Sequence, residues 1–174
     1  MSQTYNTANH KWNVVHVAAF IVLFFVLQTS YQNCRGTIIE HILVVEMTVR
    51  PSSKLISWIT PGEHVVAQGH NLISKYVQLS ILNGCEGTEA VLMLTAATLV
   101  FTRGHRRKLF SIIAGSLLIF TVNQARIVAL YYCLRFNRSL FDVLHGYIAP
   151  LLVIGVAGLF FMLSMSNTQV TRAP

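Results

Sequence analysis

The sequence predicts an all-α integral membrane protein with about four transmembrane helices and a small extracytoplasmic segment. Of its 174 residues, 53% are apolar and only 11% are charged, and the mean hydropathy is +0.56. An average soluble domain is about a quarter charged, so a soluble globular protein is disfavoured. Four apolar stretches are long enough to cross a bilayer as helices, which takes about 17–25 residues.

The four expected spans cover residues 14–31, 87–102, 109–134 and 143–165. The first contains no Asp, Glu, Lys or Arg and no small-residue cleavage site follows it, which favours a retained anchor over a cleaved signal peptide. The second is short. The third is interrupted by Asn123, Gln124 and Arg126, and the fourth contains Pro150, which we expect to kink it.

The basic residues predict how the chain is oriented. The net charge is +7, and Arg103–Lys108 holds four cationic residues in six positions. A nucleic-acid-binding protein rarely has so apolar a composition, so we expect no nucleic-acid partner. The positive-inside rule places this loop and both termini in the cytoplasm. Residues 32–86 and 135–142 then lie outside, within a single membrane domain that covers residues 1–174 and ends in a disordered tail over 166–174.

The outer segment 32–86 is expected to carry the only structure outside the spans. Residues 37–49 suit a helix lying on the membrane surface, and Pro51 and Pro61 are expected to break the chain after it. From His64 to Leu82 apolar and polar residues alternate around a turn at residues 69–71, which predicts a β-hairpin.

Three residues stand out as candidates for chemistry. Arg126 lies near the outer end of the third span, and an ionisable residue inside a span is a functional candidate by default. Cys85 precedes the second span, where a helix N-terminus lowers the pKa of a thiol, although Glu86 and Glu89 oppose that shift. His145 lies three residues into the fourth span, again at the outer face. Each has an ordinary alternative: a snorkelling arginine, a buried small thiol, and an interfacial histidine.

Together these residues predict thiol-based acyl transfer. Three separate spans bring a thiol, a guanidinium and an imidazole to one depth at one face. A cysteine nucleophile needs a base or an electrostatic partner, and its attack on an amide carbonyl creates an oxyanion that needs donors. His145 supplies the acid/base or the ion pair, and Arg126 stabilises the oxyanion or the substrate.

The segments around these residues resemble the exosortase/archaeosortase family, and the short exosortase subfamilies in particular. The matching segments are residues 83–90 (NGCEGTEA), 123–128 (NQARIV) and 141–146 (FDVLHG). The family pattern is a Cys, an Arg and a His in that order, each at the extracytoplasmic end of a span, and the resemblance covers roughly residues 60–165.

The resemblance implies a membrane cysteine peptidase or transpeptidase of the bacterial cytoplasmic membrane, with its active site outside. Its substrates would be exported proteins that end in a short motif, a transmembrane helix and a basic cluster. By carry-over, Cys85 is the nucleophile, His145 the general acid/base or ion-pair partner, and Arg126 the oxyanion or substrate stabiliser. Asn83, Asn123 and Asp142 are candidates for supporting roles, and an accessory membrane subunit is a possible partner.

Other readings stay open. A non-catalytic assembly or scaffold protein for export of surface proteins or exopolysaccharide is the first alternative, and a small transporter subunit is weaker because the ionisable residues sit at one mouth. No cofactor is expected, and His41, His64 and His70 lack metal-ligand spacing, so no metal is expected. One further hypothesis is a disulfide between Cys34 and Cys133, which would leave Cys85 free.

Overall fold

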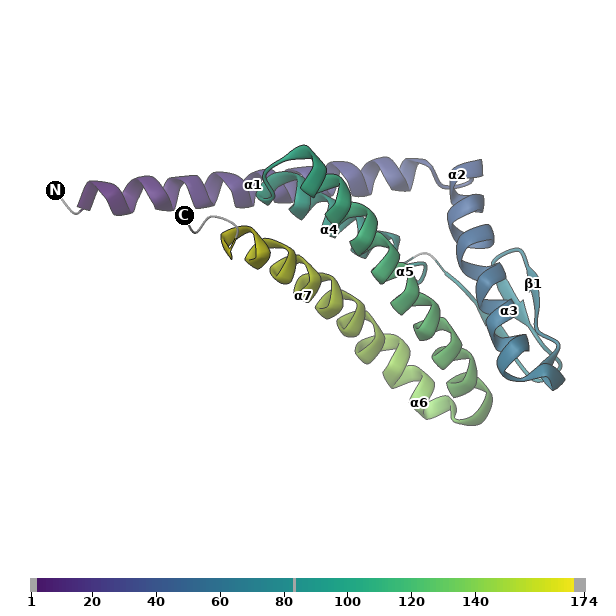
Figure 1. Cartoon of the computed structure of the whole chain (residues 1–174). Helices are drawn as coiled ribbons and strands as arrows, with labels where there is room; N and C mark the ends of the chain where they lie inside the picture. The colour runs from purple at the N-terminus through teal and green to yellow at the C-terminus, as the bar shows by residue number, and fades with distance from the viewer. Residues whose placement is uncertain (1–2, 83, 171–174) are drawn as a thin grey trace.

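The computed structural model describes residues 3–82 and 84–170 and is mostly helical. In chain order the elements are α1 (Gln3–Asn33), α2 (Ile38–Glu40), η1 (His41–Val49), α3 (Arg50–Ile59), η2 (Pro61–Glu63), β1 (Val66–Gln68), β2 (Asn71–Ile73), β3 (Gln78–Ser80), α4 (Thr88–Phe101), α5 (His105–Phe136), α6 (Arg138–Val143), η3 (Leu144–Ile148) and α7 (Ala149–Val170). Figure 1 shows the start of α1 and the end of α7 at one end of the molecule, with α3 and the sheet at the other.

Three helices are long and apolar enough to cross a membrane: Val14–Asn33, His105–Phe136 and Arg138–Ser166. They contain three of the four spans expected from the sequence. The remaining expected span, residues 87–102, corresponds to α4, which has 14 residues. At 1.5 Å per residue α4 rises only about 21 Å, less than the roughly 30 Å of a bilayer core. The count of four spans is therefore not confirmed, and the cytoplasmic location of both termini stays a prediction.

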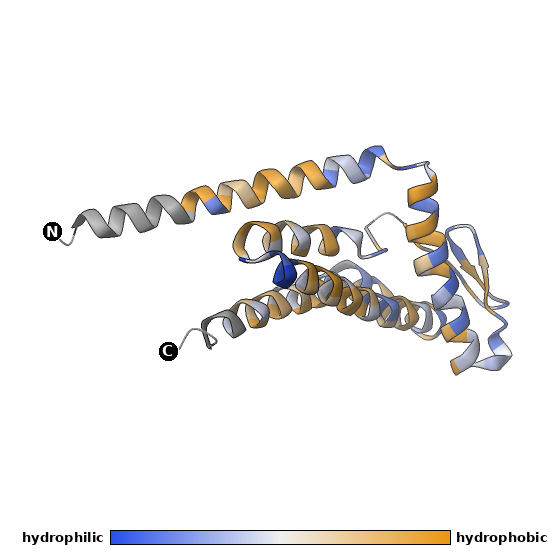
Figure 2. Cartoon of the chain, turned by 45° about the horizontal axis from the view of Figure 1, so that its top comes forward, coloured by the Kyte–Doolittle hydropathy of each residue, from blue (hydrophilic) through white to orange (hydrophobic). Residues whose placement is uncertain are grey.

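The short helix α4 is the centre of the bundle. It contacts α1, α5 and α7, and the core between these helices contains Leu94, Ile119 and Val153. At Gly115 the approach is so close that a Cβ would lie 2.3 Å from Leu94 Cδ2 and 2.8 Å from Phe160 Cε1. In Figure 2 hydrophobic residues dominate α4 and α7, whereas hydrophobic and hydrophilic residues alternate through α3 and the sheet.

The outer segment is more helical than the sequence predicts. The helix that begins at Ile38 does not break at Pro51 but continues to Ile59, so the expected break there is wrong. The helix ends before Pro61, as expected. Proline in a helix removes one backbone donor and crowds the carbonyl four residues earlier. In the same way the α6–η3–α7 helix continues through Pro150.

A π-helical stretch precedes each of these two prolines. The segment η1 ends two residues before Pro51, and η3 ends two residues before Pro150. The wider π turn, with its i→i+5 hydrogen bonds, changes which carbonyl each amide reaches. We attribute both distortions to the prolines. The helix then runs on to Val170, so the tail expected to be disordered from residue 166 is helical over its described part, and residues 171–174 lie outside the described residues.

Gln124 compensates for the donor that Pro51 lacks. Its Nε2 donates to the carbonyl oxygen of Met47, four residues before Pro51, at 3.1 Å. Its Oε1 accepts from the hydroxyl of Ser52 at 2.6 Å. Gln124 is buried, and because it lies on α5, this pair of hydrogen bonds attaches the η1–α3 helix to α5.

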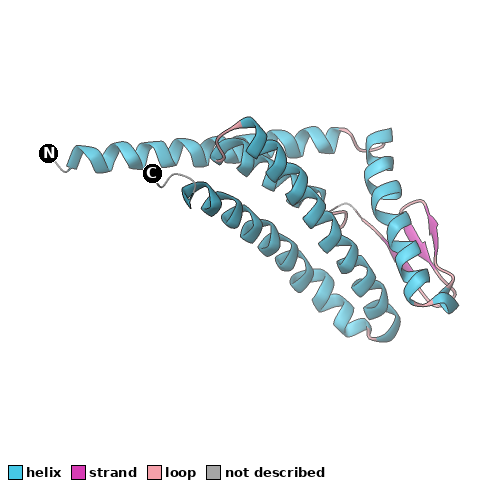
Figure 3. Ribbon diagram, viewed as in Figure 1, coloured by secondary structure: helices cyan, strands magenta, loops and turns pink. Residues whose placement is uncertain are grey.

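The expected hairpin is present, with a third strand added (Figure 3). The strands form an antiparallel sheet in the order β1-β2-β3, and Gln68 pairs with Asn71 across the predicted turn. Leu72 and Leu79 point into a core shared with Ile56 of α3 and with Ile127 and Tyr131 of α5. The sheet is therefore held against both helices.

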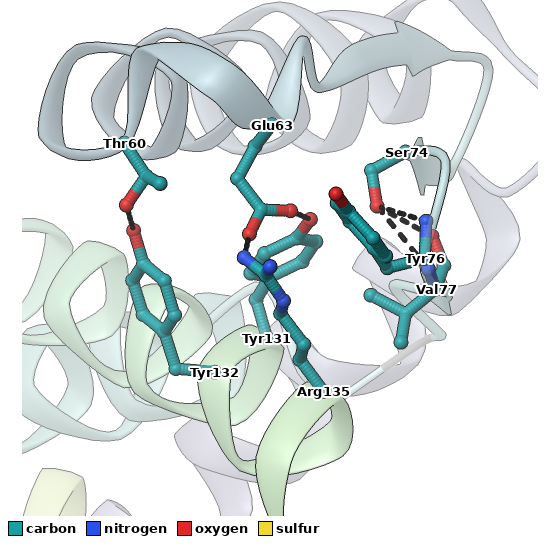
Figure 4. Close-up of polar contacts among 8 residues, drawn as sticks. All are labelled: Thr60, Glu63, Ser74, Tyr76, Val77, Tyr131, Tyr132 and Arg135. Atoms are coloured by element: carbon teal, nitrogen blue, oxygen red, sulfur yellow. Dashed lines mark hydrogen bonds and ion pairs between the residues drawn. The ribbon is translucent and has the colours of Figure 1, made fainter.

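A buried polar cluster fixes this segment to the C-terminal end of α5. The carboxylate of Glu63, which is 1% exposed, accepts from the hydroxyl of Tyr131 at 2.5 Å and forms an ion pair with Arg135. The Arg135 guanidinium also lies over the ring of Tyr76, 4.3 Å from its centre. Figure 4 shows the Glu63 carboxylate directed at both Tyr131 and Arg135, with Thr60 and Tyr132 hydrogen-bonded beside them.

Candidate functional site

Cys85 lies in a tight loop between the sheet and α4. Gly84 and Gly87 flank it with φ of +90° and +80°, a region that favours glycine. The amide of Cys85 donates to the carbonyl of Leu82 at 3.0 Å. A residue with a side chain would also not fit at position 87, because a Cβ there would lie 3.1 Å from Cγ of Asn123. The two glycines thus set the path of the loop that presents the thiol.

Arg126 reaches this thiol from α5. Its Nη2 donates to Sγ of Cys85 at 3.8 Å, and both side chains are half-buried. The Nε of Arg126 is buried and has no hydrogen-bond partner among the residues that the structure describes. Cys85 and Arg126 are 41 residues apart in the chain, so the fold brings together two of the three candidate residues.

His145 lies in the π turn η3, on the helix that continues into α7. Its ring stacks on that of Phe141, with centres 5.4 Å apart and planes at 3°. Phe141 packs against the same core cluster as Cys85. Among the described residues, His145 has no hydrogen bond to Cys85 or Arg126, and its buried Nδ1 has no partner. The structure therefore stacks His145 on a residue that packs against this cluster, but does not join His145 to the thiol.

The electrostatics of Cys85 differ from what the sequence predicts. Burial raises the pKa of the thiol above its usual value, and this effect is larger than the lowering by the charge of Arg126. The carboxylate of Glu86 raises the pKa further. The N-cap of α4 is Gly87, so Cys85 lies two residues before that cap and not in the first turn of the helix. The resting thiol is therefore a protonated group with a cation in contact.

The three supporting candidates have different outcomes. Asn123 is fully buried against the Cys85 loop, and within residues 3–82 and 84–170 neither its amide oxygen nor its amide nitrogen has a partner. Asp142 is exposed on α6 and has no hydrogen bond or ion pair in the described part of the chain, so the structure does not bring it to the thiol. Asn83 lies outside the described residues.

Two hydrogen bonds that the sequence does not predict connect α1 to this loop and to the start of α4. The hydroxyl of Tyr31 donates to Oε1 of buried Glu86 at 3.0 Å, and Nε2 of Gln28 donates to Oε1 of Glu89 at 2.9 Å. Tyr31 and Gln28 lie three residues apart, on one face of α1. Two polar residues on one face at the end of an apolar helix indicate that this face contacts polar groups. The sequence does not show that these groups are Glu86 and Glu89.

A cavity of about 160 Å³ opens beside the thiol loop. Arg126 and Glu89 line it together with the backbone at Gly84 and Gly87, and Met93, Val153 and Ile154 form apolar walls. One end of the cavity is thus polar, whereas its sides belong to α4 and α7. Its size and mixed character suit a small side chain next to a peptide group.

The other described cysteines and histidines form neither a disulfide nor a cluster of three or more metal-ligating side chains. Cys34, Cys85 and Cys133 are all free thiols, so the Cys34–Cys133 disulfide does not form. In the part of the chain that the structure describes, no group of three or more His, Cys, Asp or Glu side chains is arranged to hold a metal ion.

The reactivity of the thiol gives a direct test of this geometry. In a chain whose other two cysteines are replaced by Ala, alkylation of Cys85 should accelerate with pH around a midpoint above the usual cysteine pKa. Arg126→Gln removes a group that lowers the pKa, so the midpoint should rise. Glu86→Gln removes a group that raises it, so the midpoint should fall. The measurement is the rate of maleimide or iodoacetamide labelling across a pH series, followed by mass spectrometry.

Opposite shifts in the two variants distinguish a specific electrostatic effect from general loosening of the loop. Loosening would expose the thiol and lower its pKa in both variants. If Arg126→Gln leaves the midpoint unchanged or lowers it, the contact between Arg126 and Cys85 is not present in solution.

The chain matches no protein-family model, no curated protein sequence and no solved structure in comparisons of all three kinds.

Proposed function

We propose that this chain is a membrane cysteine peptidase or transpeptidase that cleaves C-terminal sorting signals of exported proteins, similar in chemistry to the exosortases that its motifs resemble. The observation that carries the proposal is the contact between the Arg126 guanidinium and the Cys85 thiol at 3.8 Å. A cation in contact with a half-buried thiol stabilises the thiolate and provides donors for the oxyanion that forms next.

The reaction proceeds through a thioester. The Cys85 thiol gives its proton to His145, and Sγ attacks the carbonyl carbon of the scissile peptide bond. Arg126 stabilises the oxyanion. The C–N bond then breaks, the leaving amine takes the proton from His145, and the acyl group stays on Sγ. Water or an amine then attacks the thioester, its proton passes to the sulfur through His145, and the free thiol returns.

His145 must approach the thiol for this sequence to run. Its Nδ1 is unpartnered, and the π turn that carries it is a local distortion of the kind often found at functional sites. Catalytic hydrogen bonds are often long without substrate and tighten when it binds. We therefore assign the closure of η3 onto Cys85 to the substrate-bound state.

A transmembrane substrate suits the surroundings of the thiol. The cavity that Gly84 and Gly87 of the thiol loop line has apolar walls from α4 and α7. Farther along α7, Gly155 and Gly158 are exposed, and a Cβ on either would meet no atom within 4 Å. Small residues allow close helix approach in a bilayer. We propose that the signal helix lies along α7 with the preceding motif entering the cavity.

The second candidate is a non-catalytic scaffold for protein or polysaccharide export. The raised pKa of Cys85 favours it, because a protonated thiol is a weak nucleophile. The two candidates differ in one covalent intermediate. Only the enzyme forms a bond between Cys85 and the protein that it cleaves.

The decisive experiment looks for that bond. An exported protein of the same cell that carries a terminal motif, helix and basic cluster is incubated with the purified chain, and the reaction is stopped with acid. Mass spectrometry should find the Cys85 peptide carrying the N-terminal part of the reporter as a hydroxylamine-sensitive thioester. The Cys133 peptide is the internal control and should stay unmodified. Cleavage without an adduct would overturn the thiol mechanism, and absence of both would favour the scaffold.

A further inference from the structure

A second, larger cavity lies far from the thiol, where the α4–α5 turn meets the end of α7. Its volume is about 560 Å³, and it is bordered by Arg106, Arg107, Phe110, Phe160, Leu163 and a group of hydroxyl residues that includes Ser111. This volume falls within the range of small-molecule sites, about 300–1,000 Å³. The proposed thiol chemistry makes no use of this cavity.

The cationic side of this cavity is not neutralised by the protein. In the part of the chain that the structure describes, neither Arg106 nor Arg107 has a hydrogen bond or an ion pair, and both are exposed. Their neighbour Lys108 is different, because its Nζ donates to the carbonyl of Leu99 at 2.6 Å. Two guanidinium groups at one mouth attract an anion, and arginine suits the geometry of a phosphate.

The start of α5 adds to this attraction. The helix begins at His105, its first turn has no acidic residue, and Gly104 at the cap has no side chain to bond the free amides. The positive end of a 32-residue helix therefore lies beside the two arginines without an internal counter-ion.

The other walls of the cavity are apolar and face outward. Phe110 is 72% exposed and Leu163 is 57% exposed. In a helix that crosses a bilayer these side chains meet lipid, so the cavity joins a cationic mouth to a hydrocarbon surface. A ligand that fits both parts carries a phosphate and an alkyl chain on one molecule. Basic pockets between membrane helices bind anionic lipid headgroups in this way.

We propose that this cavity binds an anionic glycerophospholipid of the cytoplasmic leaflet. The phosphate lies on Arg106 and Arg107, and an acyl chain runs along Phe110 and Leu163. The inference depends on the chain spanning a membrane with this loop inside, and it is independent of Cys85. The positive-inside rule alone accounts for the charges of the loop. It does not explain why a cavity lies beside Arg106 and Arg107 and not beside Arg103.

Arg103 provides the matched control. It belongs to the same basic loop and is exposed, but it does not line the cavity. The protein is placed in phosphatidylcholine nanodiscs that contain phosphatidylglycerol, and native mass spectrometry measures which lipid it retains. The wild type should retain phosphatidylglycerol preferentially. Arg106→Gln or Arg107→Gln should each lower that preference about five-fold, and the double variant about 30-fold, from about 1 kcal/mol for each arginine. Arg103→Gln should leave it unchanged.

A second pair of variants tests the apolar wall. Leu163→Ala removes a wall residue with all charges kept and should lower retention. Leu159→Ala changes an equally exposed residue of α7, 58% exposed, that does not line the cavity, and should not. An equal loss in the Arg103 and Arg106 variants would reduce the effect to the charge of the loop. Displacement of the lipid by inorganic phosphate would make this a site for soluble anions. Either result overturns the lipid site.

Discussion

Replacing Cys85 by Ala should abolish cleavage of a signal-bearing reporter by this chain. The reason is that no other group described near the loop is a nucleophile with a cation in contact, and loss of an essential nucleophile lowers turnover by about 10³-fold or more. The measurement is the ratio of cleaved to intact reporter over time, in membranes that contain equal amounts of each variant. Cys85→Ser keeps the size of the side chain but replaces the thiol, and it should fail equally.

The chain supplies its own controls for this prediction. Cys34→Ala and Cys133→Ala remove the other free thiols and should leave cleavage close to the wild-type rate. Arg126→Gln should lower cleavage by about 10²–10³-fold, the usual cost of one oxyanion donor, with Arg126→Lys in between. Unchanged cleavage in the Cys85→Ala membranes would remove the basis of the enzyme and leave the scaffold.

The long apolar helices were predictable because their composition shows in the sequence without any knowledge of their neighbours. A helix such as α1 or α7 shows as a long apolar run whatever its neighbours are. The continuation through Pro51 was not predictable in the same way. Whether a proline ends a helix depends on what bonds the freed carbonyl, and here the donor is Gln124 on α5, 77 residues away from Met47.

In the candidate site, too, the positions of residues were predictable and the effects of their packing were not. Depth along each span was enough to place Cys85 and Arg126 at one level, and the contact between them agrees with that expectation. The direction of the thiol pKa was not readable, because it depends on burial, which exceeds the effect of Arg126. Sequence offered no measure of that burial. The partnership of Tyr31 with Glu86 depends equally on how α1 packs against α4.

The largest expected effect on stability concerns Glu63. In Glu63→Ala the Arg135 guanidinium, whose side chain is 20% exposed, loses its carboxylate, and the hydroxyl of Tyr131 loses its acceptor. Removing one partner of a fully buried ion pair costs about 3–5 kcal/mol, because the other charge stays buried and unpaired, and half-buried Arg135 places the loss here at or below the lower end of that range. The loss should be greatest in residues 60–82, which this cluster attaches to α5. Hydrogen exchange in detergent measures it there, against α7 as an internal reference.

Two variants separate the buried charge from the loss of a contact. Glu46→Ala breaks an ion pair with Arg50 whose atoms lie 2.6 Å apart but whose side chains are 36% and 58% exposed. It should change stability by only about 0–1 kcal/mol. In the double variant Glu63→Leu/Arg135→Leu, neither charge remains, and an apolar pair of similar volume often replaces a buried ion pair without loss. Much of the protection lost in Glu63→Ala should therefore return. If the double variant exchanges as fast as Glu63→Ala, then the ion pair itself, and not the cost of an unpaired arginine, holds the sheet against α5.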